Sequence, residues 1–161
     1  QETIVVYTSD HGDALGEHGL PFKGPFLYEP LIRIPLVIAA PGVRGGTSRE
    51  EFATSADIAP TVASLAGLKW PGEIDGIDLF NHHERDAVLL EYYGKQHWVE
   101  PIRAIRTKRW KLCSYRTGER EFYDLERDPD EAHNIAGSAA TKQHEEKLMA
   151  RLQKWGQDER R

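Results

Sequence analysis

A short apolar strand that runs directly into a group of polar residues constrains the fold of this chain more than any other feature. Residues 4–7 are β-branched or aromatic without polar alternation, the pattern of a strand buried on both faces of an α/β sheet. Asp10, His11 and Gly12 follow almost at once. Because open α/β sheets bind ligands beyond the carboxyl ends of their strands, we expect a functional site at this point.

The adjacency of Asp10 and His11 suggests a metal site. A carboxylate oxygen and a neutral imidazole nitrogen together suit Mg²⁺, Mn²⁺, Ca²⁺ or Zn²⁺. Neighbouring side chains of a strand point to opposite faces, so both reach one ion only if the backbone turns sharply, which Gly12 permits. Taken alone, the pair fits better an ordinary turn in which Asp10 bonds local amides and His11 is exposed.

Lys23 changes this balance. It lies twelve positions after His11 and is followed by Gly24 and Pro25, which keep side-chain bulk away from a ligand and stiffen the loop. A lysine ammonium is a compact charge that binds oxyanions. A cation and an ammonium facing one pocket would attract a sulfate or phosphate ester and stabilise charge on its leaving oxygen. By itself, Lys23 fits equally an ordinary solvated lysine.

The order of these residues resembles the second half of type I sulfatases of the alkaline phosphatase superfamily, above all bacterial members of the choline sulfatase and phosphonate monoester hydrolase type. The resemblance implies that Asp10 and His11 ligate a divalent metal, Ca²⁺, Mn²⁺ or Mg²⁺, and that Lys23 is a catalytic residue that contacts the sulfate of a small-molecule ester. It is carried by residues 8–12, 15–20, 23–25, 28–29, 33–37 and 41–42.

Part of the family pattern is missing. Type I sulfatases carry an upstream Cys or Ser that is converted to formylglycine, followed at the second to fourth positions by Pro, Ser or Ala, and Arg. The only cysteine here, Cys113, is followed by Ser114, Tyr115 and Arg116 and does not match. The N-terminal aspartates that complete the metal shell also have no counterpart. We therefore expect the C-terminal third or so of a longer enzyme, with the formylglycine on the N-terminal part, which would be its partner.

The predicted fold class is α/β. Residues 1–83 would form the end of an alkaline-phosphatase-like mixed-sheet core with half of the metal and sulfate site, and residues 84–161 a small antiparallel subdomain with a C-terminal helix. In the first part we expect a second strand over 36–39 and a helix capped by Asp57 and ended by Gly67. In the second part we expect strands over 87–93, 102–107, 110–115 and 121–125, then a helix with Leu148, Leu152 and Trp155 on one face.

Several further polar residues can each be interpreted in two ways. His82 and His83 could bind a metal, but in a polar loop they are better explained as solvated. The basic run 106–111, which contains Trp110, is better explained as a hairpin with charged tips than as a nucleic-acid surface. The pair at 97–98, His and Trp, could border the substrate pocket. The three polar residues at 13, 17 and 18 either support the metal ligands or, as we favour, face solvent.

Composition narrows the function classes. The 161 residues carry a net charge of −5, which argues against bulk affinity for nucleic acid or acidic membranes. No apolar run approaches the ~20 residues of a membrane span, and one cysteine allows no internal disulfide. A cytoplasmic and a periplasmic location both stay open, as does a homo-oligomer.

The favoured function is sulfate ester hydrolysis by the complete protein, with this chain inactive by itself. The nearest rival is a phosphonate monoester or phosphodiester hydrolase on the same scaffold. A rival of another class is a non-catalytic binding module, which an upstream sequence without a nucleophile motif would favour.

Overall fold

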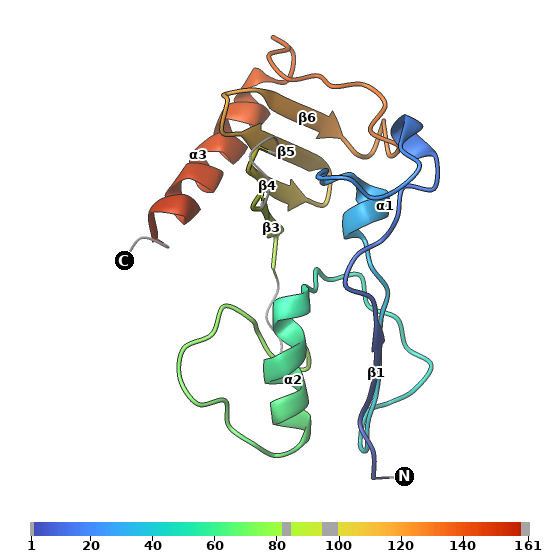
Figure 1. Cartoon of the computed structure of the whole chain (residues 1–161). Helices are drawn as coiled ribbons and strands as arrows, with labels where there is room; N and C mark the ends of the chain where they lie inside the picture. Colours follow the sequence, from blue (N-terminus) through green and yellow to red (C-terminus); the bar gives the residue numbers. More distant parts are fainter. Residues whose placement is uncertain (1, 82–84, 95–99, 159–161) are drawn as a thin grey trace. The chain divides into compact units, whose positions relative to one another are not determined.

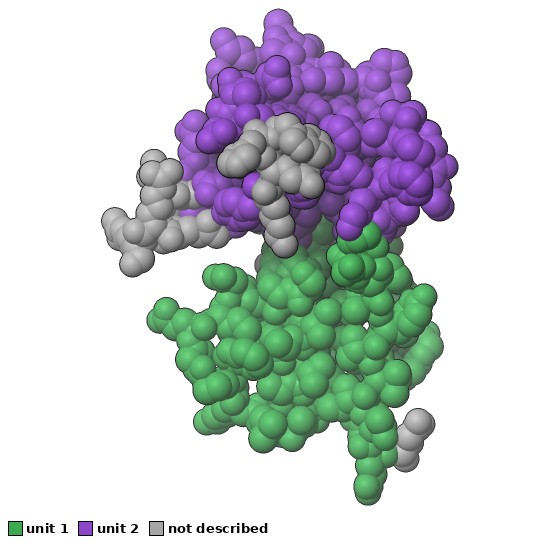
Figure 2. All heavy atoms as spheres, viewed as in Figure 1, with its two compact units in different colours: residues 1–11, 34–86 green, residues 12–33, 87–161 purple. Residues whose placement is uncertain are grey.

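The computed structural model describes residues 2–81, 85–94 and 100–158. The chain divides into two compact units that alternate along the sequence (Figure 2). The first unit comprises residues 1–11 and 34–86, and the second comprises residues 12–33 and 87–161. Residues 12–33, which precede the sequence-based boundary near residue 83, thus belong to the same unit as the C-terminal sheet.

The first unit contains a two-stranded sheet of β1, Val5–Thr8, and β2, Leu36–Ala39. The strands are antiparallel, with Val5 opposite Ala39 and Thr8 opposite Leu36. Both strands lie where the sequence predicts them. Burial on both faces is not found within the described residues, because Val5, Tyr7 and Val37 are 48%, 64% and 59% exposed. Strand β2 alternates between half-buried and exposed positions instead, and in β1 only Val6 is half-buried.

A helix follows in the same unit. A 3₁₀ turn, η2, spans Ser55–Asp57 and leads into α2, Ile58–Leu65. Gly67 follows with φ +72°, the left-handed conformation typical just after a helix C-terminus. The predicted helix is therefore confirmed. Asp57 makes no capping hydrogen bond to α2, but it caps the turn η2 that leads into α2, because its carboxylate accepts the backbone N–H of Thr54 at 2.7 Å and completes a capping box.

The second unit is built on a four-stranded antiparallel sheet in the order β3-β4-β5-β6. The strands are β3, Ala87–Tyr92; β4, Ile102–Thr107; β5, Trp110–Tyr115; and β6, Arg120–Asp124. Helix α3, Lys142–Asp158, closes the unit (Figure 1). Among the described residues no helix is long and apolar enough to cross a membrane.

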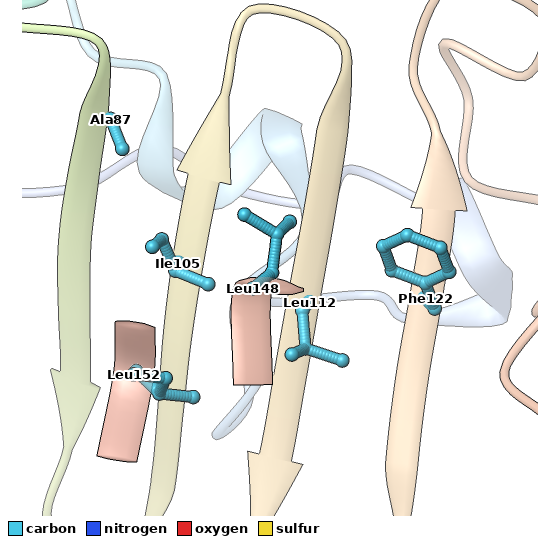
Figure 3. Close-up of a cluster of buried hydrophobic side chains, with 6 residues drawn as sticks. All are labelled: Ala87, Ile105, Leu112, Phe122, Leu148 and Leu152. Atoms are coloured by element: carbon cyan, nitrogen blue, oxygen red, sulfur yellow. The ribbon is translucent and has the colours of Figure 1, made fainter. Parts of the chain in front are cut away.

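The two faces of this sheet have different coverings. One face packs against α3 through six buried side chains, which Figure 3 shows: Ala87, Ile105, Leu112, Phe122, Leu148 and Leu152. The other face presents the alternate positions Ala104 and Cys113, against which Leu27 packs. Since successive strand residues point to opposite faces, residues 12–33 lie across the sheet from α3. That segment contains a 3₁₀ turn, η1, Glu17–Gly19, and a short helix, α1, Glu29–Ile32.

Candidate metal and sulfate site

Asp10 and His11 converge just beyond the end of β1. The Nε2 atom of His11 lies 3.5 Å from Oδ2 of Asp10, so the backbone does turn enough for two adjacent side chains to meet. Ser9 shapes this turn, because its hydroxyl donates to the carbonyl of His11 at 2.7 Å. The other carboxylate oxygen of Asp10 accepts the His11 backbone N–H at 2.9 Å. The local sequence thus brings an oxygen and a nitrogen donor to one point.

The pair is open to solvent, with the Asp10 side chain 84% exposed and the His11 side chain 43% exposed. The hydrogen bond from the His11 backbone, helped by the nearby imidazole, lowers the pKa of Asp10 below its ordinary value. Asp10 is therefore an ionised carboxylate at neutral pH, the form that a metal ion requires. An exposed pair of this kind adds little to stability.

The donor set fits part of a metal shell. Within the described ranges no group of three or more His, Cys, Asp or Glu side chains is placed to hold an ion. Hard divalent cations bind about six or more donors. Asp10 and His11 are thus suited to a share of the coordination of an ion, and the described His, Cys, Asp and Glu side chains do not complete such a shell.

Gly12 has a different role from the one predicted. A Cβ atom at Gly12 would overlap the carbonyl oxygen of Pro30, and the Gly12 N–H donates to the carbonyl of Leu31 at 2.8 Å. The glycine is required by this close approach of two backbone segments. Gly12 therefore closes the loop 12–33 at its base.

Lys23 lies on this loop, between η1 and α1, and is exposed. Gly24 beside it has φ +57°, a conformation that favours glycine, and a Cβ there would press on the ring of Phe26. The loop is also held by ring stacking. The imidazole of His18 stacks on Tyr28 with ring centroids 3.8 Å apart, and Tyr28 lies edge-on to Tyr123 of β6.

His18 is exposed, as we favoured from the sequence. The stacking on Tyr28 gives it an additional packing role that the sequence did not predict. Its φ of +52° lies in the left-handed region, which costs free energy for a residue with a Cβ. Asp13 also has a local role, since its carboxylate accepts the Ala14 N–H at 2.8 Å.

The three predicted site residues divide between the two units. Asp10 and His11 belong to the first unit and are brought together, whereas Lys23 belongs to the second unit. Their combination in one site stays a prediction. The histidines at 82 and 83 and the pair at 97–98 lie outside the described residues.

The basic run 106–111 is not simply a solvated hairpin. Lys108 is exposed, as expected for a hairpin tip, but Lys111 has no exposed surface. Arg106 and Lys111 are ion-paired to Glu29 of α1, and Arg109 makes a two-bond contact with Asp124. The sequence of β5 could have indicated the burial of Lys111. Alternate residues of a strand lie on the same face, so Lys111 shares a face with Cys113, which is buried.

The family of the chain follows from its sequence over most of its length. A family model described as "N-sulphoglucosamine sulphohydrolase, C-terminal" matches residues 16–158. The chain belongs to this sulfatase family. The match includes Lys23 and begins after Asp10 and His11.

Individual sulfatases and related hydrolases are similar in the same region. The choline-sulfatase of Rhizobium meliloti is 37% identical over 142 residues, which are 84% of this chain and 27% of that protein. A solved structure of a protein in complex with its substrate D-glucosamine-2-N,6-O-disulfate is 34% identical, with a TM-score of 0.86 over 96% of this chain and 34% of that chain. The phosphonate monoester hydrolase of Agrobacterium radiobacter is 26% identical, with a TM-score of 0.85 over 94% of this chain and 34% of that one.

These similarities confirm the resemblance and the fold class inferred from the sequence, including the C-terminal position within the sulfatase family. The chain spans 27% of the length of the choline-sulfatase. Any activity, substrate or bound metal is therefore proposed below for the complete protein and not for this chain alone.

Proposed function

We propose that the complete protein is a sulfuric ester hydrolase in which Asp10 and His11 bind a divalent metal and Lys23 contacts the sulfate. The observation that carries the proposal is the match of residues 16–158 to the sulfatase family. The similarity to a choline-sulfatase and to a protein that binds a sulfated glucosamine supports a sulfate ester as the substrate.

The geometry of Asp10 and His11 supports their role as ligands of one ion. Two ligand atoms about 2.2 Å from a cation lie roughly 3.1 Å apart at a right angle, and farther apart at wider angles. The observed separation of 3.5 Å between the Nε2 and Oδ2 atoms suits this arrangement. The local turn at Ser9 holds the pair before an ion binds, so little rearrangement is needed.

A bound Ca²⁺, Mn²⁺ or Mg²⁺ would supply Lewis-acid chemistry, and a formylglycine on the N-terminal part of the complete protein would supply the nucleophile. The residues of this chain would bind the metal ion and neutralise the negative charge of the sulfate group. Asp10 contributes a negative charge and His11 a neutral donor on one side. Lys23 contributes an ammonium that binds the sulfate oxygens and stabilises negative charge as the ester bond breaks. The chain alone would then lack turnover.

A second candidate is hydrolysis of a phosphonate monoester or a phosphodiester. The similarity to the phosphonate monoester hydrolase of Agrobacterium radiobacter supports this candidate. A metal and a lysine also bind the oxygens of phosphorus esters, so Asp10, His11 and Lys23 do not discriminate between sulfate and phosphorus esters.

The test is a substrate panel on the full-length protein, supplied in turn with Ca²⁺, Mn²⁺ and Mg²⁺. The panel contains an aryl sulfate, choline sulfate, a sulfated glucosamine, a phosphonate monoester and a phosphodiester. We expect the largest kcat/KM for a sulfate ester. A preference for a phosphorus ester would establish the second candidate. Failure to turn over any compound would favour the non-catalytic binding module.

A further inference from the structure

Four ionisable side chains meet on the sheet face that lies across from α3. Arg106 of β4 and Lys111 of β5 are directly opposite one another in the strand register. Glu29 lies at the start of α1, and Glu131 follows β6. The side chains of Lys111 and Glu131 have no exposed surface, and those of Glu29 and Arg106 are only 13% and 18% exposed. We call these four residues the buried ion cluster.

The cluster also binds the backbone of Leu27 and Glu29. The ammonium of Lys111 donates to the carbonyl of Leu27 at 2.7 Å and forms an ion pair with Glu131. The second carboxylate oxygen of Glu131 accepts the backbone N–H of Glu29 at 2.6 Å. Lys111 of the C-terminal sheet and Glu131, which follows it, thus hold a segment that lies about eighty to a hundred positions earlier in the chain.

Glu29 itself is held by both cations. The guanidinium of Arg106 donates to its two carboxylate oxygens at 3.0 and 3.3 Å, and the ammonium of Lys111 lies 3.4 Å from one of them. Burial alone would raise the pKa of Glu29, but the hydrogen bonds and charges of the two cations lower it below its ordinary value. The carboxylate is therefore ionised when the segment is in place.

The charges explain why the arrangement is specific. Two like charges directly opposite in an antiparallel pair are destabilising, so Arg106 and Lys111 need carboxylates beside them. Glu29 supplies one only when α1 sits on the sheet. Buried ion pairs add little net stability compared with apolar packing, but leaving one partner unpaired is costly. The cluster therefore penalises any other position of residues 27–29.

We propose that the buried ion cluster positions the loop that carries Lys23, so that the C-terminal sheet sets the place of the sulfate-binding ammonium. Lys23 lies four residues before Leu27, with the fixed backbone of Pro25 between them. The ring contact between Phe26 and Tyr28, with centroids 5.6 Å apart, shortens the free segment further. The cluster residues are positioning residues, and the role given to Lys23 rests on the proposed function.

The first measurement is amide hydrogen exchange of the full-length protein, which does not depend on activity. Lys111→Met removes the buried ammonium, and Glu131→Gln is a milder variant that keeps the side-chain shape. Arg109→Met is the matched control, because Arg109 also makes a two-bond ion pair, with Asp124, on the same sheet. In the two cluster variants, but not in the control, we expect the amide exchange rates of residues 24–32 to be about tenfold or more above those of the wild type. Unchanged exchange there in both variants would overturn the proposal.

The second measurement is a double-mutant cycle between Lys111 and Lys23. Lys111→Met should lower kcat/KM about tenfold or more, since small misplacements of a binding group are costly. In a Lys23→Ala background it should cause no further loss. A purely structural role would reduce kcat/KM by the same factor in both backgrounds, which would overturn the link to Lys23. If exchange rises but Lys23→Ala is fully active, the loop placement stands and the proposed role of Lys23 is wrong.

Discussion

The buried carboxylate of Asp57 offers the sharpest test of the electrostatics in the first unit. It has no exposed surface and accepts five hydrogen bonds. Two come from the guanidinium of Arg85 at 2.7 and 2.9 Å, two from the backbone N–H and hydroxyl of Thr54 at 2.7 and 3.1 Å, and one from the Ile77 N–H at 2.8 Å. Asp57→Asn keeps the shape but replaces one acceptor oxygen with an NH₂ group that faces donors.

The expected cost follows from the burial of the two charges. Removing one partner of a buried ion pair costs about 3–5 kcal/mol. The side chain of Arg85 keeps 20% of its surface exposed, so water recovers part of its solvation. We therefore expect the free energy of unfolding to fall by about 3 kcal/mol, the lower end of this range.

The pH dependence of the stability difference between wild type and Asp57→Asn is an independent test. Burial alone would raise the pKa of Asp57, but hydrogen bonds from Arg85 and from two backbone N–H groups outweigh it and lower the pKa below its ordinary value of 3.8. A carboxyl with a lowered pKa in the folded state stabilises the fold above its unfolded pKa, and this contribution is lost as the pH falls through the folded pKa. The difference between wild type and Asp57→Asn should therefore be largest above about pH 5 and shrink below pH 3.8.

The assay is urea unfolding of the full-length protein between neutral pH and pH 3. The control is Glu51→Gln, because the Arg49–Glu51 pair is 45% and 44% exposed and its loss should cost less than about 0.5 kcal/mol. A cost below about 1 kcal/mol for Asp57→Asn, or a difference that stays constant down to pH 3, would refute the reasoning.

Further outcomes are expected for the site and the core. In the full-length protein, Lys23→Ala should lower kcat/KM about a hundredfold while the free energy of unfolding changes by about 0.5 kcal/mol or less. Lys23→Arg should restore only part of the lost kcat/KM, because a planar guanidinium does not replace a compact ammonium. Near-normal activity of the alanine variant would contradict the proposed contact of Lys23 with the sulfate. Asp10→Asn and His11→Ala should each weaken divalent metal binding about tenfold or more by calorimetry, since even residues that only support metal ligands matter that much; unchanged affinity would exclude them as ligands. The isolated chain should hydrolyse no aryl sulfate above a Lys23→Ala control and bind no divalent ion at sub-micromolar concentration. Either turnover or such binding would mean that this chain holds a complete site by itself. Leu152→Ala should cost about 2–5 kcal/mol because this side chain is 3% exposed, whereas exposed Gln153→Ala should stay within about 0.5 kcal/mol; equal effects in urea unfolding would contradict the described core.

The elements whose signal is local could be predicted from the sequence. Strands β4 and β5 have the predicted bounds, because the two charged residues 108 and 109 between them mark a short hairpin connection. The ends of β3 and β6 differ by one residue from the prediction, where the alternation fades into loops. The turn at Asp10 and His11 is also local, and the bond from the His11 amide to Asp10 and the exposure of His11 are those expected of the pair taken alone; a shared metal ion stays a prediction.

Interactions between distant residues could not be predicted in this way. Asp57 sits before an apolar periodic segment, which is also the pattern of a helix cap, yet its main partner is Arg85, 28 positions later. Lys111 lies in a basic run, yet its carboxylate partners are Glu29 and Glu131. A sequence pattern shows the charge of a side chain, whereas only the fold shows which charge lies next to it.

The exposed residues of β1 and β2 show that the same reasoning applies to contacts with the rest of the complete protein. Val5 and Tyr7 on β1 and Val37 on β2 are apolar or aromatic residues typical of a covered strand, yet about half or more of each is exposed. Burial on both faces was predicted from residue types, which reflect the contacts a strand makes in its complete protein. The chain matches only 27% of the choline-sulfatase, and the described ranges give β1 one strand partner, β2. Asp10 and His11 directly follow β1 in the chain. A segment of the complete protein that covers β1 would therefore also place its side chains near the metal site proposed at this pair.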